Sequence, residues 1–152
     1  MLELKHAISI TAVGSRVTCV PAPTDTDRDW LVMVEPGKAI DFDLALIGAG
    51  WEMGGSDIPE SSNLTPECDR FHSFTKTVDG VTENIIATSS QPFHERFLAA
   101  TSVAKRLNLL SKNDRIALFQ AVLYGNGDIS QGWPSTHYFS MRALPAPAEA
   151  IF

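Results

Sequence analysis

The sequence has little cysteine, no long apolar run and no targeting signal. Only two of its 152 residues are cysteine, Cys19 and Cys68, and they form no metal-binding motif, so we expect reduced thiols rather than a disulfide framework. No apolar stretch approaches the roughly 18 residues that a membrane span needs. The first residues also lack the basic start and small-residue cleavage site of a signal peptide. We therefore expect a cytoplasmic protein without a membrane partner.

Basic residues are also scarce. The chain has 12 Lys and Arg against 18 Asp and Glu, a net charge of -6, and the basic residues are scattered. A protein that grips a long nucleic-acid duplex usually shows a basic stripe, so a long duplex is not an expected partner, whereas short or single-stranded nucleic acid is not excluded. The four histidines have no ligand spacing, and a zinc site is not expected.

What the chain does have is the composition of one soluble domain. Apolar residues make up 44% and charged residues 20%, and we find no internal repeat. We expect a single domain over residues 1–152, with an irregular insertion at about 50–70 and an irregular tail at about 126–152. The insertion is rich in Gly, Ser, Pro and acidic residues, and loops of this length often carry function.

The pattern of apolar residues predicts strands first and helices later. In the first half we expect a short helix over 1–8, strands over 9–13 and 29–34, a loop over 17–26 and a helix over 38–50 whose Ile40, Leu44 and Ile47 share one face. Asp79-Gly80 predicts a hairpin between strands near 71–76 and 82–88.

The C-terminal half predicts two helices, over 89–110 and 111–125. The first has Ser90 as a cap and a buried stripe consisting of Phe93, Phe97, Ala100, Ala104 and Leu107. The second begins with a capping pair, Ser111 and Asp114. Its Lys112 and Arg115 are interpreted as a solvated face, although they could reach a phosphate. A small mixed sheet with helices packed on it, an α/β or α+β fold, accommodates this order of elements.

Three aspartates stand at alternate positions, 25, 27 and 29, where the loop becomes a buried strand. Because alternate residues of a strand share a face, Asp27 and Asp29 should project together. Two carboxylates so close repel each other, and such a site either shares a proton or holds cations, of which Mg²⁺ suits oxygen ligands best. For Asp25 a turn hydrogen bond is the simpler explanation, and for the other two the alternative is solvated charge at the start of a strand.

A third acid from a neighbouring strand would complete a two-metal site. Glu83 is the candidate, because it lies in an otherwise apolar strand. Asn84 competes for the inward position, since a shift of one residue in register exchanges the two. Gly14 and Ser15 are the candidates for binding the phosphates of the substrate. Glycine lets the backbone approach a phosphate, the serine hydroxyl can hydrogen-bond to it, and Arg16 adds positive charge.

Gly-Ser followed about a dozen residues later by Asp-x-Asp at the start of an apolar strand resembles the nucleotidyltransferase superfamily that includes DNA polymerase β. More narrowly, residues 8–125 resemble small, uncharacterised nucleotidyltransferase-like proteins of phages and bacteria. The resemblance implies that Gly14 and Ser15 bind the triphosphate of a nucleoside triphosphate such as ATP, and the positive charge of Arg16 makes it a third candidate for this binding. It implies that Asp27, Asp29 and Glu83 are catalytic and bind Mg²⁺ or Mn²⁺.

The expected function is therefore metal-dependent transfer of a nucleotidyl group to an unknown hydroxyl acceptor, which could be a small molecule, a protein or an RNA end. The alternative is a non-catalytic phage protein on the same scaffold, which binds a nucleotide, a nucleic acid or a partner protein. If the protein is phage-encoded, its location would be the host cytoplasm. A nuclease or phosphatase is less well supported, because neither needs Gly-Ser at the end of the preceding strand.

Overall fold

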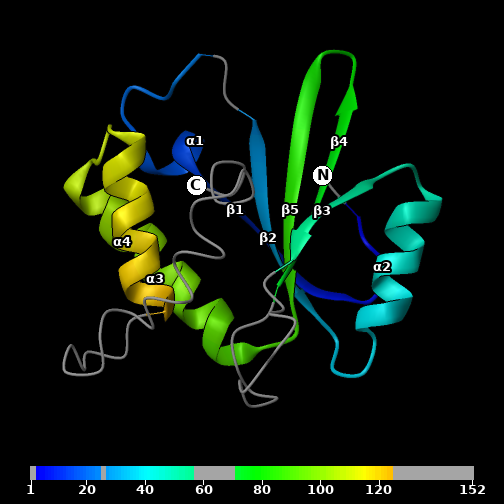
Figure 1. Cartoon of the computed structure of the whole chain (residues 1–152). Coiled ribbons are helices and arrows are strands. Elements are labelled where there is room, and N and C mark those ends of the chain that lie inside the picture. Colours follow the sequence, from blue (N-terminus) through cyan, green and yellow to red (C-terminus); the bar gives the residue numbers. More distant parts are fainter. Residues whose placement is uncertain (1–2, 25–26, 57–70, 125–152) are drawn as a thin grey trace.

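The computed structural model of the chain describes residues 3–24, 27–56 and 71–124 (Figure 1). Its elements are β1 (Ala7–Val13), α1 (Ser15–Thr18), β2 (Arg28–Val34), α2 (Ala39–Gly48), β3 (Glu52–Ser56), β4 (His72–Val78), β5 (Val81–Thr88), α3 (Gln91–Leu107) and α4 (Lys112–Tyr124). The predictions for Asp25, for Cys68 and for the tail at 126–152 lie outside the described residues, as does most of the insertion.

The five strands form one mixed sheet in the order β1-β2-β5-β4-β3. Strands β2 and β5 run parallel, and the other neighbours are antiparallel. The α+β fold with a mixed sheet is thus confirmed. The hairpin between β4 and β5 is confirmed as well, because Asp79 and Gly80 both have the positive φ that such a turn requires.

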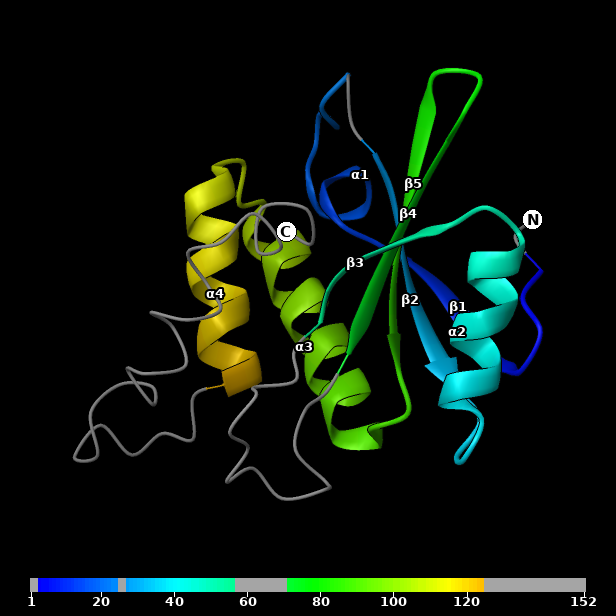
Figure 2. The ribbon, with the colours of Figure 1, turned by 45° about the vertical axis from the view of Figure 1, so that its right-hand side comes forward.

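Helices cover the sheet on both faces, with α3 and α4 on one side and α2 on the other (Figures 1 and 2). Strand alternation sends Leu31 and Ile86 into the apolar cluster under α3 and α4, whereas Val32 and Ile85 enter the cluster under α2. The face under α3 and α4 is therefore the one that receives Asp29. Among the described residues, no helix has the length and apolar character to cross a membrane.

Helix α3 supplies most of the core on its side. Its cap is confirmed, because the Ser90 hydroxyl accepts the backbone N–H of Phe93 at 3.3 Å. The predicted stripe is buried at Phe93, Phe97, Ala100 and Ala104. Its last member, Leu107, is 60% exposed, since α3 ends there and α4 does not cover it.

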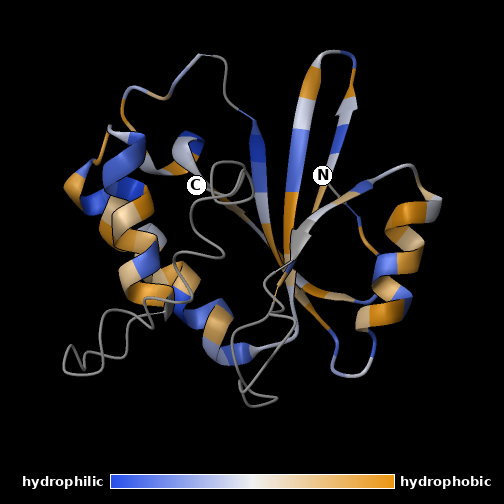
Figure 3. Cartoon of the chain, viewed as in Figure 1, coloured by the Kyte–Doolittle hydropathy of each residue, from blue (hydrophilic) through white to orange (hydrophobic). Residues whose placement is uncertain are grey.

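Helix α2 turns a different face to the sheet from the one that stands out in the sequence. Phe42 and Leu46 are buried against the sheet, whereas Ile40, Leu44 and Ile47, which do share a face, are exposed. Figure 3 shows the resulting hydrophobic colour along much of this helix. The spacing of apolar residues alone could not decide between the two faces, because both are apolar.

Three parts of the sequence-based prediction are wrong. The helix predicted over 1–8 is absent from the described residues 3–8: β1 begins at Ala7, because pairing with β2 offers this segment more than one isolated helical turn could. A short helix, α1, interrupts the predicted loop at 17–26. A strand, β3, occupies the start of the predicted irregular region at 50–70 and pairs with β4.

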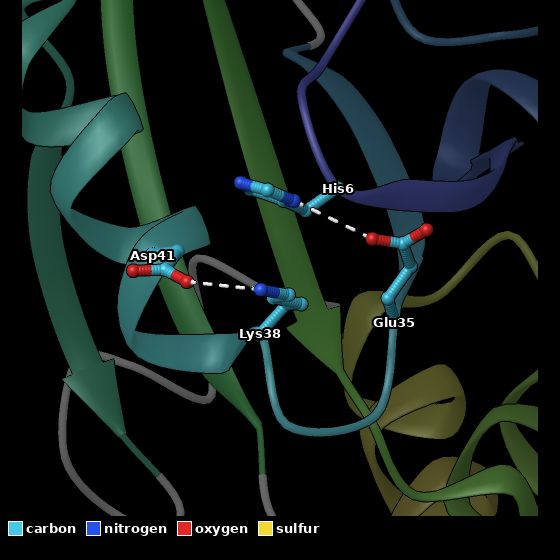
Figure 4. Close-up of polar contacts among 4 residues, drawn as sticks. All are labelled: His6, Glu35, Lys38 and Asp41. Atoms are coloured by element: carbon cyan, nitrogen blue, oxygen red, sulfur yellow. Dashed lines mark hydrogen bonds and ion pairs between the residues drawn. The ribbon is translucent and has the colours of Figure 1, made fainter.

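The turn from β2 into α2 is tied to the start of β1. His6 Nδ1 lies 3.4 Å from Glu35 Oε2, and the backbone N–H of Glu35 donates to the carbonyl of His6 at 3.0 Å. Beside it, Lys38 and Asp41 form an ion pair at 3.7 Å, as Figure 4 shows. These contacts fix the end of the sheet opposite to the one where Gly14 and Asp29 meet.

Arg115 is buried rather than solvated, with only 6% of its surface exposed. Its guanidinium donates to the carbonyls of Leu109 and Leu110 at 2.9 and 2.8 Å and lies 3.3 Å from the Cys19 sulfur. Asn108 adds a pair of side-chain hydrogen bonds to the backbone of Val20. Together these contacts attach the segment after α1 to the turn between α3 and α4.

Candidate functional site

The site is built where β1 ends and β2 begins. The last pair of the β1–β2 ladder is Val13 with Asp29, and the chain then leaves the sheet at Gly14, whose φ is +83°. A Cβ at position 14 would overlap the Asp29 carboxylate, lying 2.9 Å from its Cγ. Glycine is therefore required here twice, for the backbone conformation and for the close approach of the carboxylate. Ser15 and Arg16 follow directly, at the start of α1.

Asp27 and Asp29 converge, as the alternation along the strand predicts. Asn84 of β5 lies between them: its side-chain N–H₂ donates to Asp29 Oδ1 at 3.0 Å and to Asp27 Oδ2 at 3.2 Å. The Asn84 carbonyl accepts the hydroxyl of Thr75 from β4. We call Asp27, Asp29 and Asn84 the aspartate site. Its asparagine is 7% exposed, so its polar groups need these partners.

Glu83, by contrast, does not join the aspartates. It is paired across the sheet with Arg28, whereas Asn84 is paired with Asp29, so Glu83 lies on the opposite face. There its carboxylate accepts the indole N–H of Trp30 at 3.3 Å. The expected third carboxylate is thus replaced by Asn84, the residue that competed for the position in the sequence. Within the described residues, no three His, Cys, Asp or Glu side chains gather as a metal-binding group.

Burial dominates the electrostatics of the site. It raises the pKa of Asp29 from 3.8 to about 7, and the negative charge of Asp27 acts in the same direction. The hydrogen bond from Asn84 and the charges of Lys112 and Arg16 lower that pKa and offset part of the effect. Near neutral pH, Asp29 is therefore balanced between its protonated and ionised forms, and added positive charge would favour the ionised form.

The donor set suits one divalent cation of the Mg²⁺ type. Such an ion typically takes one or two carboxylates and completes its shell with water and substrate phosphates. The N–H₂ group of Asn84 now makes the contacts that a cation would make with Asp27 and Asp29. A site for two ions usually uses at least one more carboxylate, which the described residues do not supply.

Two basic residues stand near the aspartates, Arg16 from α1 and Lys112 from the start of α4, and the charges of both act on Asp29. Arg16 was expected here, whereas Lys112 was interpreted as part of a solvated helix face. Its proximity arises because the turn between α3 and α4 is attached to α1. No local sequence signal marks this contact.

A hollow of about 360 Å³ opens beside Asp29. It is lined by Ala12, Val13, Arg16, Val17, Arg28, Asp29 and Trp30. Beyond the last pair of the β1–β2 ladder, β1 no longer covers the edge of β2, and α1 turns away. The hollow thus lies at the corner left between these elements.

Comparisons with known proteins add a weak structural likeness. No family model matches the chain, and no curated protein matches it. Among solved structures, the chain is similar to a cytoplasmic RNA terminal U-transferase, with a TM-score of 0.41 and 17% sequence identity. The match covers 72% of this chain and 30% of that protein, so the chain spans about a third of its length. A likeness at this level carries no argument about function, and the narrower resemblance to phage and bacterial proteins stays a prediction.

Proposed function

We propose that the chain is a nucleotidyltransferase-like protein that binds a nucleoside triphosphate together with one divalent cation at the aspartate site. The reaction that such a complex would support is transfer of the nucleotidyl group to the hydroxyl of an acceptor. A small molecule, a protein and an RNA end are the candidate acceptors.

One observation carries the proposal: the backbone at Gly14 lies against the carboxylate of Asp29. Gly14 and Ser15 are separated in sequence from Asp27 and Asp29, and neither pair alone is distinctive. Their meeting at one corner of the sheet puts a glycine turn beside two converging carboxylates. A triphosphate with its cation needs this combination, because the turn can approach the phosphate and the carboxylates can hold the ion.

Each of these residues would have a separate role in binding the nucleotide. Asp27 and Asp29 would hold the cation, which when bound neutralises charge on the phosphates. Gly14 and Ser15 would lie along the phosphate chain, and Arg16 and Lys112 would add positive charge from two sides. Binding would require Asn84 to give up its contacts with at least one aspartate. In this scheme the protein supplies mainly positioning and electrostatic stabilisation.

Calorimetric titration with each of the four nucleoside triphosphates, with and without Mg²⁺, tests the proposal. We expect binding that depends on Mg²⁺ and that is lost in Asp27→Asn and in Asp29→Asn. Glu83→Gln is the matched control, because it also removes one carboxylate. Glu83 lies near the start of β5, beside the start of β2, but on the opposite face of the sheet from the aspartates. Mg²⁺-dependent binding that is lost equally in Glu83→Gln, or absent from folded wild type, would contradict the proposal.

The position of Asn84 favours a second candidate, a protein that binds the nucleotide without transferring it. An acid at this position would help to activate the attacking hydroxyl, and a neutral carboxamide cannot do so. The two functions separate in an assay that follows label from the α-phosphate of the bound nucleotide into RNA, protein or small molecules of a cell extract. A labelled product that depends on Asp29 supports transfer. Binding without any product supports the second candidate.

A further inference from the structure

The first strand of the chain, β1, lies at one edge of the sheet and lacks most of the features that protect such an edge. It pairs with β2 on one side, and no other described strand pairs with it (Figure 1). An edge strand presents unpaired N–H and C=O groups, which proteins usually protect with charged side chains, proline or a very short strand. β1 is seven residues long and contains neither a charged residue nor a proline. Its ladder with β2 is irregular between Ala7 and Ser9 and regular from Ser9 to Val13. We call the side of β1 that faces away from β2 the β1 edge.

The opposite edge of the sheet, formed by β3, is better protected. That strand has only five residues, among them the acidic Glu52 and two glycines. Its pairing with β4 is irregular between Met53 and Ser56. Short length, a charge, glycine and an irregular register all weaken the pairing of a further strand. Of the two edges, the β1 edge is therefore the one suited to binding another strand.

The regular part of β1 is complementary to a copy of itself in the antiparallel direction. Hydroxyl and apolar side chains alternate along it, from Ser9 through Ile10, Thr11 and Ala12 to Val13. A two-fold axis at Thr11 would put Thr11 opposite Thr11 of the second copy and Ile10 opposite Ala12. An axis at Ile10 would put Ser9 opposite Thr11. Both registers match hydroxyl with hydroxyl and apolar with apolar at the centre, and such cross-strand pairs stabilise a sheet.

The charges at the two ends of β1 favour the same direction. Arg16 is exposed just beyond the C-terminal end of the strand. Beside the N-terminal end, the exposed Glu3 and Glu35 outnumber the exposed Lys5, and the backbone N–H of Glu35 donates to the carbonyl of His6. Antiparallel pairing would bring Arg16 of each copy toward the acidic end of the other copy. Parallel pairing would instead bring like charges together.

We propose that the β1 edge binds the β1 edge of a second copy of this chain, antiparallel and about a two-fold axis, so that the two sheets join into one. The interface is isologous, because both copies use the same surface. A single pair of strands buries less than the standard interface of about 800 Å² on each partner, so we expect a weak dimer whose population depends on protein concentration. The inference does not depend on the proposed function, since the pairing uses the backbone of β1 and no side chain of the aspartate site.

Sedimentation equilibrium from micromolar to millimolar protein tests the proposal, with Ala12→Lys as the variant. Ala12 is exposed on β1, so a lysine there leaves the fold intact and puts two positive charges close together across the two-fold axis. Ala45→Lys is the matched control, because Ala45 is an exposed alanine on α2. We expect wild type and Ala45→Lys to dimerise equally, and Ala12→Lys to dimerise at least about 10-fold more weakly. Both variants should keep the wild-type circular dichroism spectrum.

A wild type that stays monomeric over this range, or equal weakening in the two variants, would overturn the inference. Weakening in Ala45→Lys alone would also overturn it. That result would place the contact on α2, where Ile40, Leu44 and Ile47 form an exposed apolar face.

Amide hydrogen exchange shows whether the β1 edge itself is the interface. Along β1, the amides that point away from β2 should exchange more slowly as the concentration of wild type rises, and should not do so in Ala12→Lys. If these amides are protected equally at all concentrations in a monomer, another segment of the same chain covers the edge, and the inference is wrong. A dimer whose formation protects amides of β3 and none of β1 would contradict it as well.

Discussion

Replacing Asp29 by asparagine should stabilise the metal-free protein at alkaline pH while removing its function. Asp29 is a carboxyl group held in a site that disfavours its charge, because burial and the neighbouring Asp27 both raise its pKa. Asparagine has nearly the same shape and no charge. The variant therefore isolates the cost of ionising this one group.

The size of the effect follows from the pKa, which rises from 3.8 to about 7. At about 1.4 kcal/mol for each pH unit, this corresponds to about 4 kcal/mol. Below pH 3.8 both the folded and the unfolded state carry the proton, and there is no effect. Between pH 4 and about 7 only the unfolded state loses its proton, so the stability of wild type falls as the pH rises, and the deficit stays constant above that range.

The measurement is urea unfolding in the presence of a chelator, at pH 4.5 and pH 8 as chosen test conditions, for wild type and Asp29→Asn. We expect the variant to be more stable by about 1 kcal/mol at pH 4.5, where the unfolded state has already lost most of this proton, and by up to about 4 kcal/mol at pH 8. Asp114→Asn is the control, because Asp114 is an exposed aspartate in the first turn of α4 and should show no such gain. Parallel pH profiles for wild type and Asp29→Asn would refute the reasoning.

Three further predictions concern the fold around the site. Gly14→Ala should lower the free energy of unfolding by about 1–3 kcal/mol because of the positive φ, and further because the new Cβ overlaps Asp29. The same variant should show no nucleotide binding in calorimetry. Asn84→Asp should add the missing carboxylate: Mn²⁺ should bind more tightly by electron paramagnetic resonance titration, and the metal-free protein should unfold at lower urea concentration at pH 8. Phe97→Ala should cost about 3–5 kcal/mol by urea unfolding, since Phe97 is 1% exposed and packs against Phe119. Unchanged stability in the first or last variant, or unchanged Mn²⁺ affinity in the second, would contradict the packing or the site described above.

The aspartates could be predicted from the sequence because local geometry determines how they point. Alternation along a strand puts Asp27 and Asp29 on one face whatever the rest of the fold does, and the strand itself is marked by a continuous apolar run. The cap at Ser90 and the turn at Asp79-Gly80 are local in the same sense. Each depends on a few neighbouring residues, and each is confirmed.

The third position could not be predicted, because it depends on the register between two strands that are far apart in sequence. Residues 83 and 84 are equally polar interruptions, and a shift of one residue exchanges them. What decides is the pairing of Asn84 with Asp29 in the parallel ladder. Arg115 was misinterpreted in part for a similar reason: two of its partners are the nearby carbonyls of Leu109 and Leu110, but the third, the Cys19 sulfur, lies 96 residues away in sequence.

The central claim, that the Asp29 carboxyl binds the cation of a bound nucleotide, is tested most directly by counting protons. Because the pKa of Asp29 is about 7, most of its carboxyl groups carry a proton at pH 6, and binding of the cation must release it. Calorimetry of nucleotide with Mg²⁺, in two buffers of different ionisation enthalpy, measures that release. We predict the release of roughly one proton more at pH 6 than at pH 8.5, both in wild type and in the control Glu83→Gln, which keeps both aspartates. Equal proton release at the two pH values, with Mg²⁺-dependent binding intact, would contradict the account.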